Sequence, residues 1–349
     1  MIEVCVLILS FFVKLGFGQG LLPSGDPYFC VPSGICPDTS GGGIDPRIIT
    51  PDGGTNPTPD PGAIVCPAGK VPCFAQGPSS NCGLRLVPIT NTADGFAQFG
   101  AYPWQAYLTG PTGAFLGSGS LLSPYHVLTA AHKVLAFVGN PSQLTVIMGV
   151  NDPANINTLP ASSRSVAAQI SIFNAATYNN ATLKNNLAIV RLANPISLLN
   201  QNSINTVCLP PSTSNANTYS TPSQRCLVSG WGQIQPTNPA VPTQLKQVTV
   251  STTDINTCAN GFTGRVNTTA YLDMTGGQIC AGGEAQKDAC FQDGGGPMTC
   301  GAGTSASRFT VAGIVIWGKS CGQAGVYGVY TNVPFYRAWI IQTITQPIP

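Results

Sequence analysis

Short apolar segments separated by turn-forming residues follow one another through most of the chain. Three of them, residues 119–122 (GSLL), 144–148 (LTVIM) and 309–316 (FTVAGIVI), are rich in aliphatic and β-branched side chains, which is typical of β-strands. Residues 334–341 (PFYRAWII) have a helical apolar spacing and an opening proline, which suits the first turn of a helix. The pattern predicts a domain of short strands closed by one helix.

The first 18 residues have a different pattern. Their apolar run ends in Gly16-Phe17-Gly18, small residues of the kind that signal peptidase requires. Glu3 makes the start atypical, and a membrane anchor is the alternative, but the run is short and Lys14 interrupts it. No later segment approaches transmembrane length. We therefore expect a signal peptide at residues 1–18, a secreted extracellular protein and no membrane span.

Charge and cysteine content narrow the class of protein further. Only 8% of the residues are charged, the formal net charge is +2 and no basic run is present, so we expect no nucleic-acid partner. Removing Cys5 with the signal peptide from the 13 cysteines leaves twelve, an even number that suits an oxidising compartment. The two histidines, His126 and His132, stand alone, so we expect no metal site and no cofactor.

Four sequence blocks resemble the catalytic domain of the chymotrypsin/trypsin family in both order and spacing. They are residues 128–132 (LTAAH), 185–192 (NNLAIVRL), 288–297 (DACFQDGGGP) and 316–318 (IWG). The resemblance runs from about residue 86 to the end of the chain. It implies an all-β, trypsin-like fold: two six-stranded antiparallel β-barrels with a C-terminal helix.

The resemblance also assigns three positions where that family carries its catalytic residues. His132 matches the general base, but Asn186 stands in place of the orienting aspartate and Gly294 in place of the nucleophilic serine. Without a hydroxyl no acyl-enzyme can form. An amide supplies no negative charge and can present its NH2 group to the wrong imidazole tautomer. Gln292 also replaces a glycine of the oxyanion hole. We therefore expect a pseudoprotease with a degenerate triad, in which His132 is a relic.

Other positions match the walls of a substrate pocket. The resemblance implies that Asp288 lies where trypsin-like enzymes accept Lys or Arg, beside Trp317, Gly318 and Gly328. The alternative is a solvated Asp288 on a zymogen-like loop.

Activation by a freed N-terminus is not expected. Asp293, which in active relatives pairs with a freed amine, has no evident partner because Ile89, the nearest candidate terminus, follows Pro88 instead of a basic residue.

The resemblance implies four disulfides and leaves four cysteines over. The implied bridges are Cys82–Cys208, Cys226–Cys300, Cys258–Cys280 and Cys290–Cys321. Lys133 and Gly117 occupy the places of a further family bridge, so both partners are lost together. The pairing of Cys30, Cys36, Cys66 and Cys73 stays open.

The N-terminal cysteines lie in a module that resembles the clip domains of arthropod proteases. Residues 28–37 (YFCVPSGICP) match the opening of a clip domain, and residues 43–48 (GIDPRI) also fit, although the usual six cysteines are incomplete. A plain disulfide-tied linker is the alternative. Residues 50–62 are too rich in proline and glycine to fold. We expect a degenerate clip-like pro-region at residues 19–82 and a pseudoprotease domain at residues 83–349.

Two arginines are candidate processing sites. Arg47, beside the Pro/Gly-rich segment, lies where we expect no disulfide to cross the chain, so a cut there would expose or release a clip-like surface. Arg85 is the second candidate, with Cys82–Cys208 holding the pieces together. Asn180 and Asn267 head acceptor sequences for N-glycosylation.

Three functions remain open at this stage. The resemblance favours a secreted, inactive clip-domain protease homologue of the masquerade or prophenoloxidase-activating-factor type. Such a protein would be a cofactor or regulator in an arthropod immune or melanisation cascade. Its partners would be extracellular: a protease, a prophenoloxidase-like zymogen or a pattern-recognition protein. A structural or venom-gland secretion is the alternative, and a weak hydrolase that uses His132 is the third. The sequence does not give the oligomeric state.

Overall fold

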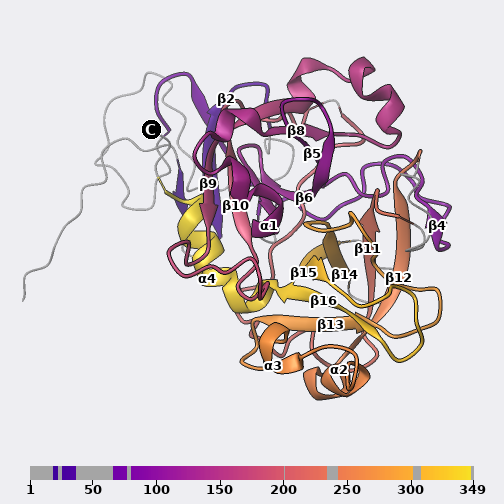
Figure 1. Cartoon of the computed structure of the whole chain (residues 1–349). Helices are drawn as coiled ribbons and strands as arrows, with labels where there is room; N and C mark the ends of the chain where they lie inside the picture. The colour runs from indigo at the N-terminus through magenta and orange to yellow at the C-terminus, as the bar shows by residue number, and fades with distance from the viewer. Residues whose placement is uncertain are drawn as a thin grey trace, which may run out of the picture.

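A computed structural model describes residues 19–22, 26–36, 66–76, 80–199, 201–233, 243–301 and 308–346. Figure 1 shows two β-barrels side by side, a small N-terminal sheet and a C-terminal helix. The predicted signal peptide, Arg47 and the Pro/Gly-rich segment 50–62 lie outside the described residues.

The first barrel is built from six antiparallel strands and is closed, in the order β10-β7-β6-β5-β8-β9. Its strands are β5 (Gln105–Thr109), β6 (Phe115–Ser123), β7 (His126–Thr129), β8 (Thr145–Met148), β9 (Arg164–Ile172) and β10 (Ala188–Leu192). The apolar runs predicted at residues 119–122 and 144–148 fall on β6 and β8. Their side chains, among them Leu121 and Val146, are fully buried in the barrel core, so burial of these runs stabilises the closed sheet.

The second barrel has the same design. Its strands are β11 (Arg225–Gly230), β12 (Lys246–Thr253), β13 (Gln278–Gly282), β14 (Pro297–Gly301), β15 (Phe309–Trp317) and β16 (Tyr327–Asn332). The order β11-β14-β15-β16-β13-β12 closes through a β11–β12 pairing. A two-residue strand, β4 (Gly95–Phe96), adds to the outer edge of β12. The predicted trypsin-like double barrel is confirmed.

The predicted closing helix is α4 (Val333–Ile344), with Pro334 in its first turn. Tyr336, Ile340 and Ile344 are buried, and the ring of Trp339 lies 5.5 Å from that of Phe173 in the first barrel. The helix therefore spans from the end of β16 to the first barrel (Figure 1). The remaining helices are short: α1 (Ala131–Val134), α2 (Ile255–Gly261), α3 (Thr268–Tyr271) and the 3-10 turns η2 (Leu135–Phe137), η3 (Pro141–Gln143), η4 (Pro153–Thr158) and η5 (Ala161–Ser163).

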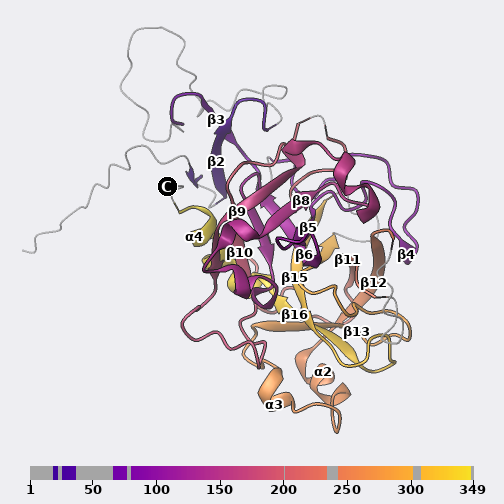
Figure 2. The same cartoon turned by 45° about the horizontal axis from the view of Figure 1, so that its top comes forward.

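The N-terminal module forms a three-stranded sheet of β1 (Gln19–Leu21), β2 (Pro27–Pro32) and β3 (Lys70–Cys73). Figures 1 and 2 place β2 beside the first barrel, near β9. Gln76 carries much of this docking, because its side chain donates to the carbonyls of Leu122 and Val207 and accepts from the N–H of Leu209, each at 2.7 Å. Phe29 is fully buried against the ring of His126.

The disulfides of this module correct one expectation. The structure pairs Cys30 with Cys66 and Cys36 with Cys73. Both bridges join the chain before Arg47 to the chain after it, so the stretch around Arg47 is crossed twice. A cut there would leave both pieces covalently joined and still docked through Gln76. The expected release of a clip-like surface is therefore wrong.

The structure contains all four bridges that the resemblance implied. They are Cys82–Cys208, Cys226–Cys300, Cys258–Cys280 and Cys290–Cys321. Cys82–Cys208 links the segment that follows the N-terminal sheet to the segment between the barrels. Such cross-links typically stabilise a fold by about 2–4 kcal/mol each.

Candidate functional site

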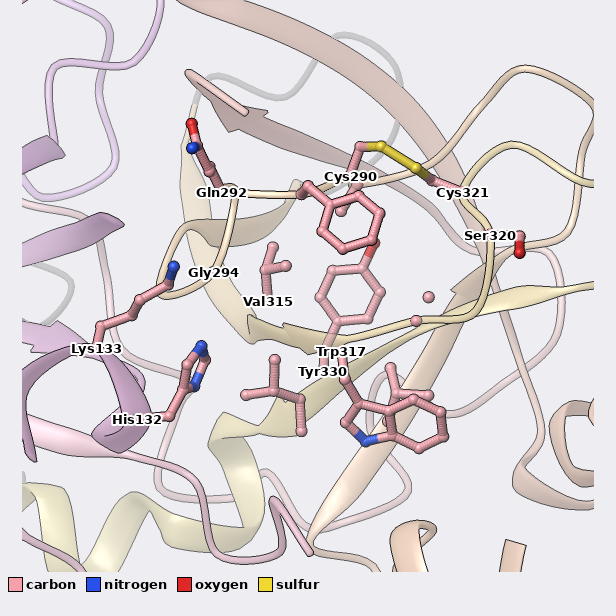
Figure 3. A pocket seen from close by; sticks show the side chains of 16 residues that line it. His132, Lys133, Cys290, Gln292, Gly294, Val315, Trp317, Ser320, Cys321 and Tyr330 are labelled. Carbon is pink, nitrogen blue, oxygen red and sulfur yellow. A yellow bond between two sulfur atoms is a disulfide. The ribbon is translucent and has the colours of Figure 1, made fainter. Parts of the chain in front are cut away.

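A cavity of about 270 Å³ lies where the two barrels meet. Helix α1 forms one wall, and the loop before β14 together with the ends of β15 and β16 forms the others (Figure 3). The lining residues are His132, Lys133, Ala289, Cys290, Phe291, Gln292, Gly294, Val315, Ile316, Trp317, Gly318, Ser320, Cys321, Gly328, Val329 and Tyr330. Three predicted pocket residues, Trp317, Gly318 and Gly328, are among them.

The fold brings the three triad positions together from distant parts of the chain. His132 lies on α1 directly after β7, Asn186 precedes β10, and Gly294 lies in the turn before β14. The Nδ2 of Asn186 is 2.9 Å from Nδ1 of His132. A side chain at Gly294 would begin 3.0 Å from Nε2 of His132. The geometry of a catalytic triad is therefore kept without two of its chemical groups.

The contacts of Asn186 fix the tautomer of His132. Its Oδ1 accepts from the backbone N–H of His132 at 3.0 Å and from the Tyr178 hydroxyl at 3.2 Å. Because a backbone N–H can only donate, this atom is the amide oxygen and the NH2 group faces Nδ1. Nδ1 must then accept, which puts the imidazole proton on Nε2. A general base needs the opposite tautomer.

The His132 ring is also kept neutral. Burial, followed by the positive charge of Lys133, lowers its pKa to about 4. At neutral pH His132 therefore presents an uncharged Nε2–H donor toward Gly294.

Lys133 is the site residue that sequence reasoning missed. Its aliphatic stem crosses Gly117, where an added Cβ would lie 2.9 Å from Lys133 Cδ. Its Cε stands 2.5 Å from the position that a Cβ of residue 294 would take. Lys133 thus partly fills the space of the absent nucleophile (Figure 3). The sequence showed that Gly117 and Lys133 stand where the family has a cysteine pair. This indicated a missing disulfide but not the position of the Lys133 side chain.

The loop that the resemblance assigns to the oxyanion hole carries Gln292 in place of a glycine. Gln292 adopts a left-handed backbone with φ of 75°, a conformation that costs a residue other than glycine about 1 kcal/mol or more. The buried carboxylate of Asp293 accepts from the N–H groups of Gly232 and Cys290, each at 2.8 Å.

The chain that follows Ile89 is held on the second barrel by hydrogen bonds. Gln98 binds the N–H groups of Thr90 and Asn91, and Asp94 accepts from the N–H of Thr249 at 2.7 Å. Since β4 also pairs with β12, and since Ile89 is partly buried against the core, this segment is fixed in place without a freed terminus at Ile89.

Asp288 does not line this cavity; it is partly exposed and lines a second cavity together with Asp94, Lys246 and Asp293. Its Oδ2 accepts from the N–H of Gly322 at 3.1 Å, while Oδ1 is buried with no hydrogen-bond partner. Burial raises the pKa of this carboxyl to about 7. Asp288 is therefore partly buried, with one carboxyl oxygen shielded from solvent. A Cβ on Gly328 would lie 2.8 Å from Oδ1, so the glycine is what lets the carboxyl approach the pocket.

The remaining predicted positions lie away from the cavity. Arg85 donates to the carbonyl of Ala101 at 2.9 Å, and its guanidinium covers the rings of Phe309 at 4.5 Å and Tyr102 at 5.5 Å. A protease would have to withdraw this side chain before cutting after it. Asn180 and Asn267 are both exposed. In the described part of the chain no three His, Cys, Asp or Glu side chains gather as a metal site.

Among the described residues, no helix has the length and apolarity that crossing a bilayer demands.

Comparison with known proteins agrees with this geometry. The Trypsin family matches residues 95–340. The chain is 36% identical over 329 residues to the inactive CLIP domain-containing serine protease A3 of Aedes aegypti, an alignment that covers 90% of this chain and 66% of that protein. It is 31% identical to the phenoloxidase-activating factor 2 of Galleria mellonella, covering 74% and 84%.

Active relatives also match. Identity to the trypsin of Sus scrofa is 31% over 243 residues, which covers 69% of this chain and 90% of that enzyme. The chain spans about two thirds of the length of the mosquito relative. The family match agrees with the double barrel and with the way His132, Asn186 and Gly294 come together. The chain therefore belongs to the trypsin family of serine proteases.

Proposed function

We propose that the protein is a secreted, catalytically inactive clip-type protease homologue. In this role it serves as a non-enzymatic cofactor or regulator in an extracellular proteolytic cascade of the arthropod immune or melanisation type. The observation that carries the inactive state is the site of Gly294, which has no nucleophile and whose side-chain space is partly filled by Lys133. The names of two relatives, an inactive CLIP-domain protease and a phenoloxidase-activating factor, support the cascade role.

Loss of activity here has several independent causes. Gly294 cannot form an acyl-enzyme. The Asn186 amide puts the His132 proton on the wrong nitrogen for a general base. Asp293 is held by backbone N–H groups instead of a freed terminal amine. A residual hydrolase that uses His132 would need all of these to be overcome.

Such a cofactor would act through its surface on another extracellular protein. The partner classes are a cascade protease, a prophenoloxidase-like zymogen or a pattern-recognition protein. A structural or gland-secreted carrier is the second candidate, favoured by the low charged fraction of 8%. Glycans at the exposed Asn180 and Asn267 suit either role.

Reconstitution in body fluid separates these candidates. The protein would be depleted from the fluid of the source organism with an antibody and then restored as purified material. We expect zymogen activation after a microbial stimulus to fall on depletion and to recover with the purified protein. A fluorophosphonate probe, which reacts with activated serines, should not label it. Unchanged activation after complete depletion contradicts the cascade role, and specific labelling contradicts the inactive state.

A further inference from the structure

The two substitutions in the degenerate triad, together with Lys133, leave two nitrogen donors that face one empty position. His132 Nε2 lies 3.0 Å, and Lys133 Cε 2.5 Å, from the place of a Cβ at Gly294. Figure 3 shows the ends of both side chains directed toward Gly294. The NH2 group of Asn186 donates to Nδ1 of His132, so the imidazole proton is on Nε2, which is then a donor. The centre that would activate a hydroxyl in a protease here presents an ammonium group and an N–H group.

Lys133 takes part in no ion pair among the described residues. The ion pairs found there are Arg225–Glu284, Lys287–Asp94, Lys287–Glu284 and Arg337–Asp26, none of which involves Lys133. Asp293 acts on it electrostatically, but both oxygens of that carboxylate accept from backbone N–H groups. Burial lowers the pKa of Lys133, a cost that an anionic ligand would offset.

The rest of the cavity is mainly apolar and suits a side chain attached to that anion. Val315, Ile316 and the ring of Trp317 line it, and the fully buried Tyr330 has a hydroxyl with no partner. In an active protease a peptide crosses the nucleophile and continues beyond it. Here Lys133 occupies that point, so a chain that ends there would meet the ammonium instead of a serine.

We propose that this cavity binds the C-terminal residue of a peptide or protein, with its α-carboxylate on Lys133 Nζ and His132 Nε2–H and its side chain in the apolar pocket. The backbone N–H groups of Gln292 and Gly294, which line the cavity and have no acceptor among the described residues, are further donors near the same position. Carboxylates held by an ammonium and neighbouring N–H groups form strong, charge-assisted bonds. This site adds a ligand class and does not depend on a role in a cascade.

The test compares free-acid and amide forms of two peptides with the full-length protein. N-terminally fluorescein-labelled Ala-Ala-Leu and Ala-Ala-Arg would each be titrated as the acid and as the C-terminal amide, with affinity read by fluorescence polarisation. We expect at least one acid to bind about tenfold or more tightly than its own amide, as charge-assisted hydrogen bonds imply. Equal binding of both forms, or no binding of any peptide at millimolar concentration, overturns the proposal.

A lysine variant locates the effect. Lys133→Met keeps the stem but removes the charge, and we expect it to erase the difference between acid and amide. Lys70→Met, on strand β3 of the N-terminal sheet, is the matched control and should keep it. Should Lys133→Met fail to fold, carbodiimide coupling of the bound acid followed by peptide mapping must place the new amide bond on Lys133. A retained preference in Lys133→Met, or coupling only to other lysines, rules the site out.

Discussion

The reaction centre and the pocket beside it have departed from the active family to different degrees. At the reaction centre, Asn186 and Lys133 from the first barrel and Gln292 and Gly294 from the second differ from the residues that the family carries in an active enzyme. In the pocket, Trp317, Gly318 and Gly328 keep their places, and the Cys290–Cys321 bridge still ties the loop together. The reaction centre is changed while the pocket is kept. This difference favours a site that recognises a ligand without transforming it.

Restoring the nucleophile is the strongest test of this comparison. We expect Gly294→Ser alone to give no detectable cleavage of an Arg-nitroanilide substrate, at least about 10⁴-fold below an active trypsin, because His132 remains in the wrong tautomer. The new side chain would also collide with Lys133, whose Cε lies 2.5 Å from the added Cβ.

The matched control for this experiment is the triple variant Gly294→Ser, Asn186→Asp, Lys133→Ala, which removes the collision and the amide together. Of the two variants only this one should react with a fluorophosphonate probe, and it should react slowly, because Gln292 and the backbone contacts of Asp293 remain. Robust turnover by the single variant would show that the reaction centre has kept more of its catalytic function than the geometry indicates.

The charge state of Asp288, on the second-barrel side, can be tested through the pH dependence of stability. Its folded pKa of about 7 lies above the usual value of 3.8, so the unfolded chain releases this proton first and stability falls as pH rises from about 4 to 7. We expect Asp288→Asn to be more stable than the native protein at pH 7.5 by roughly 1–3 kcal/mol, and equally stable near pH 4. Denaturant melts at both pH values measure this.

Asp254→Asn is the contrasting substitution, because the Asp254 side chain caps α2 by accepting from the N–H groups of Asn256 and Thr257. These hydrogen bonds lower its pKa, so Asp254→Asn should not stabilise the protein at pH 7.5. A loss of stability in Asp288→Asn at neutral pH would mean that the carboxylate has a cationic partner in solution.

A negative charge restored at position 186 should have a smaller effect, which we expect in the pKa of His132. Asn186→Asp places a carboxylate beside Nδ1, and an adjacent opposite charge typically raises a pKa by about 1–3 units. We expect the His132 pKa to rise from about 4 in the native protein. An NMR titration of the imidazole resonances would follow it, with His126 as the internal reference. An unchanged His132 titration would contradict the assigned contact.

Processing at Arg47 should have the smallest effect on the fold. Because Cys30–Cys66 and Cys36–Cys73 both span this position, the nicked protein should run as one species without reductant and as two with it. N-terminal sequencing should find Ile48, and the melting temperature should change little. A new terminus at Leu86 would instead show that Arg85 leaves its contacts with Phe309 and Tyr102.

The sequence was sufficient for features that depend on local pattern or on the family blocks. Strands β6, β8 and β15, helix α4 and the double barrel could all be predicted, because periodicity and four spaced motifs specify them. The position of Lys133 could not, since it depends on how residues 117, 133 and 294 meet in space. The same is true of the contact between the Arg85 guanidinium and the Phe309 ring, and of the hydrogen bonds from Gln76 to Leu122 and Val207. These contacts join residues that no local spacing relates.

The docking of Gln76 has a consequence for how the protein is made. Two of its partners, Val207 and Leu209, are translated long after it. The same holds for Cys208, which pairs with Cys82 across 126 residues of sequence. At about 5–20 residues per second the ribosome needs roughly 6–25 s to cover that interval. Until then Gln76 lacks two of its three backbone partners, and Cys82 lacks its native partner. The N-terminal sheet is therefore translated before the segment that completes its docking, and it is among the last parts of the described fold to reach its final structure.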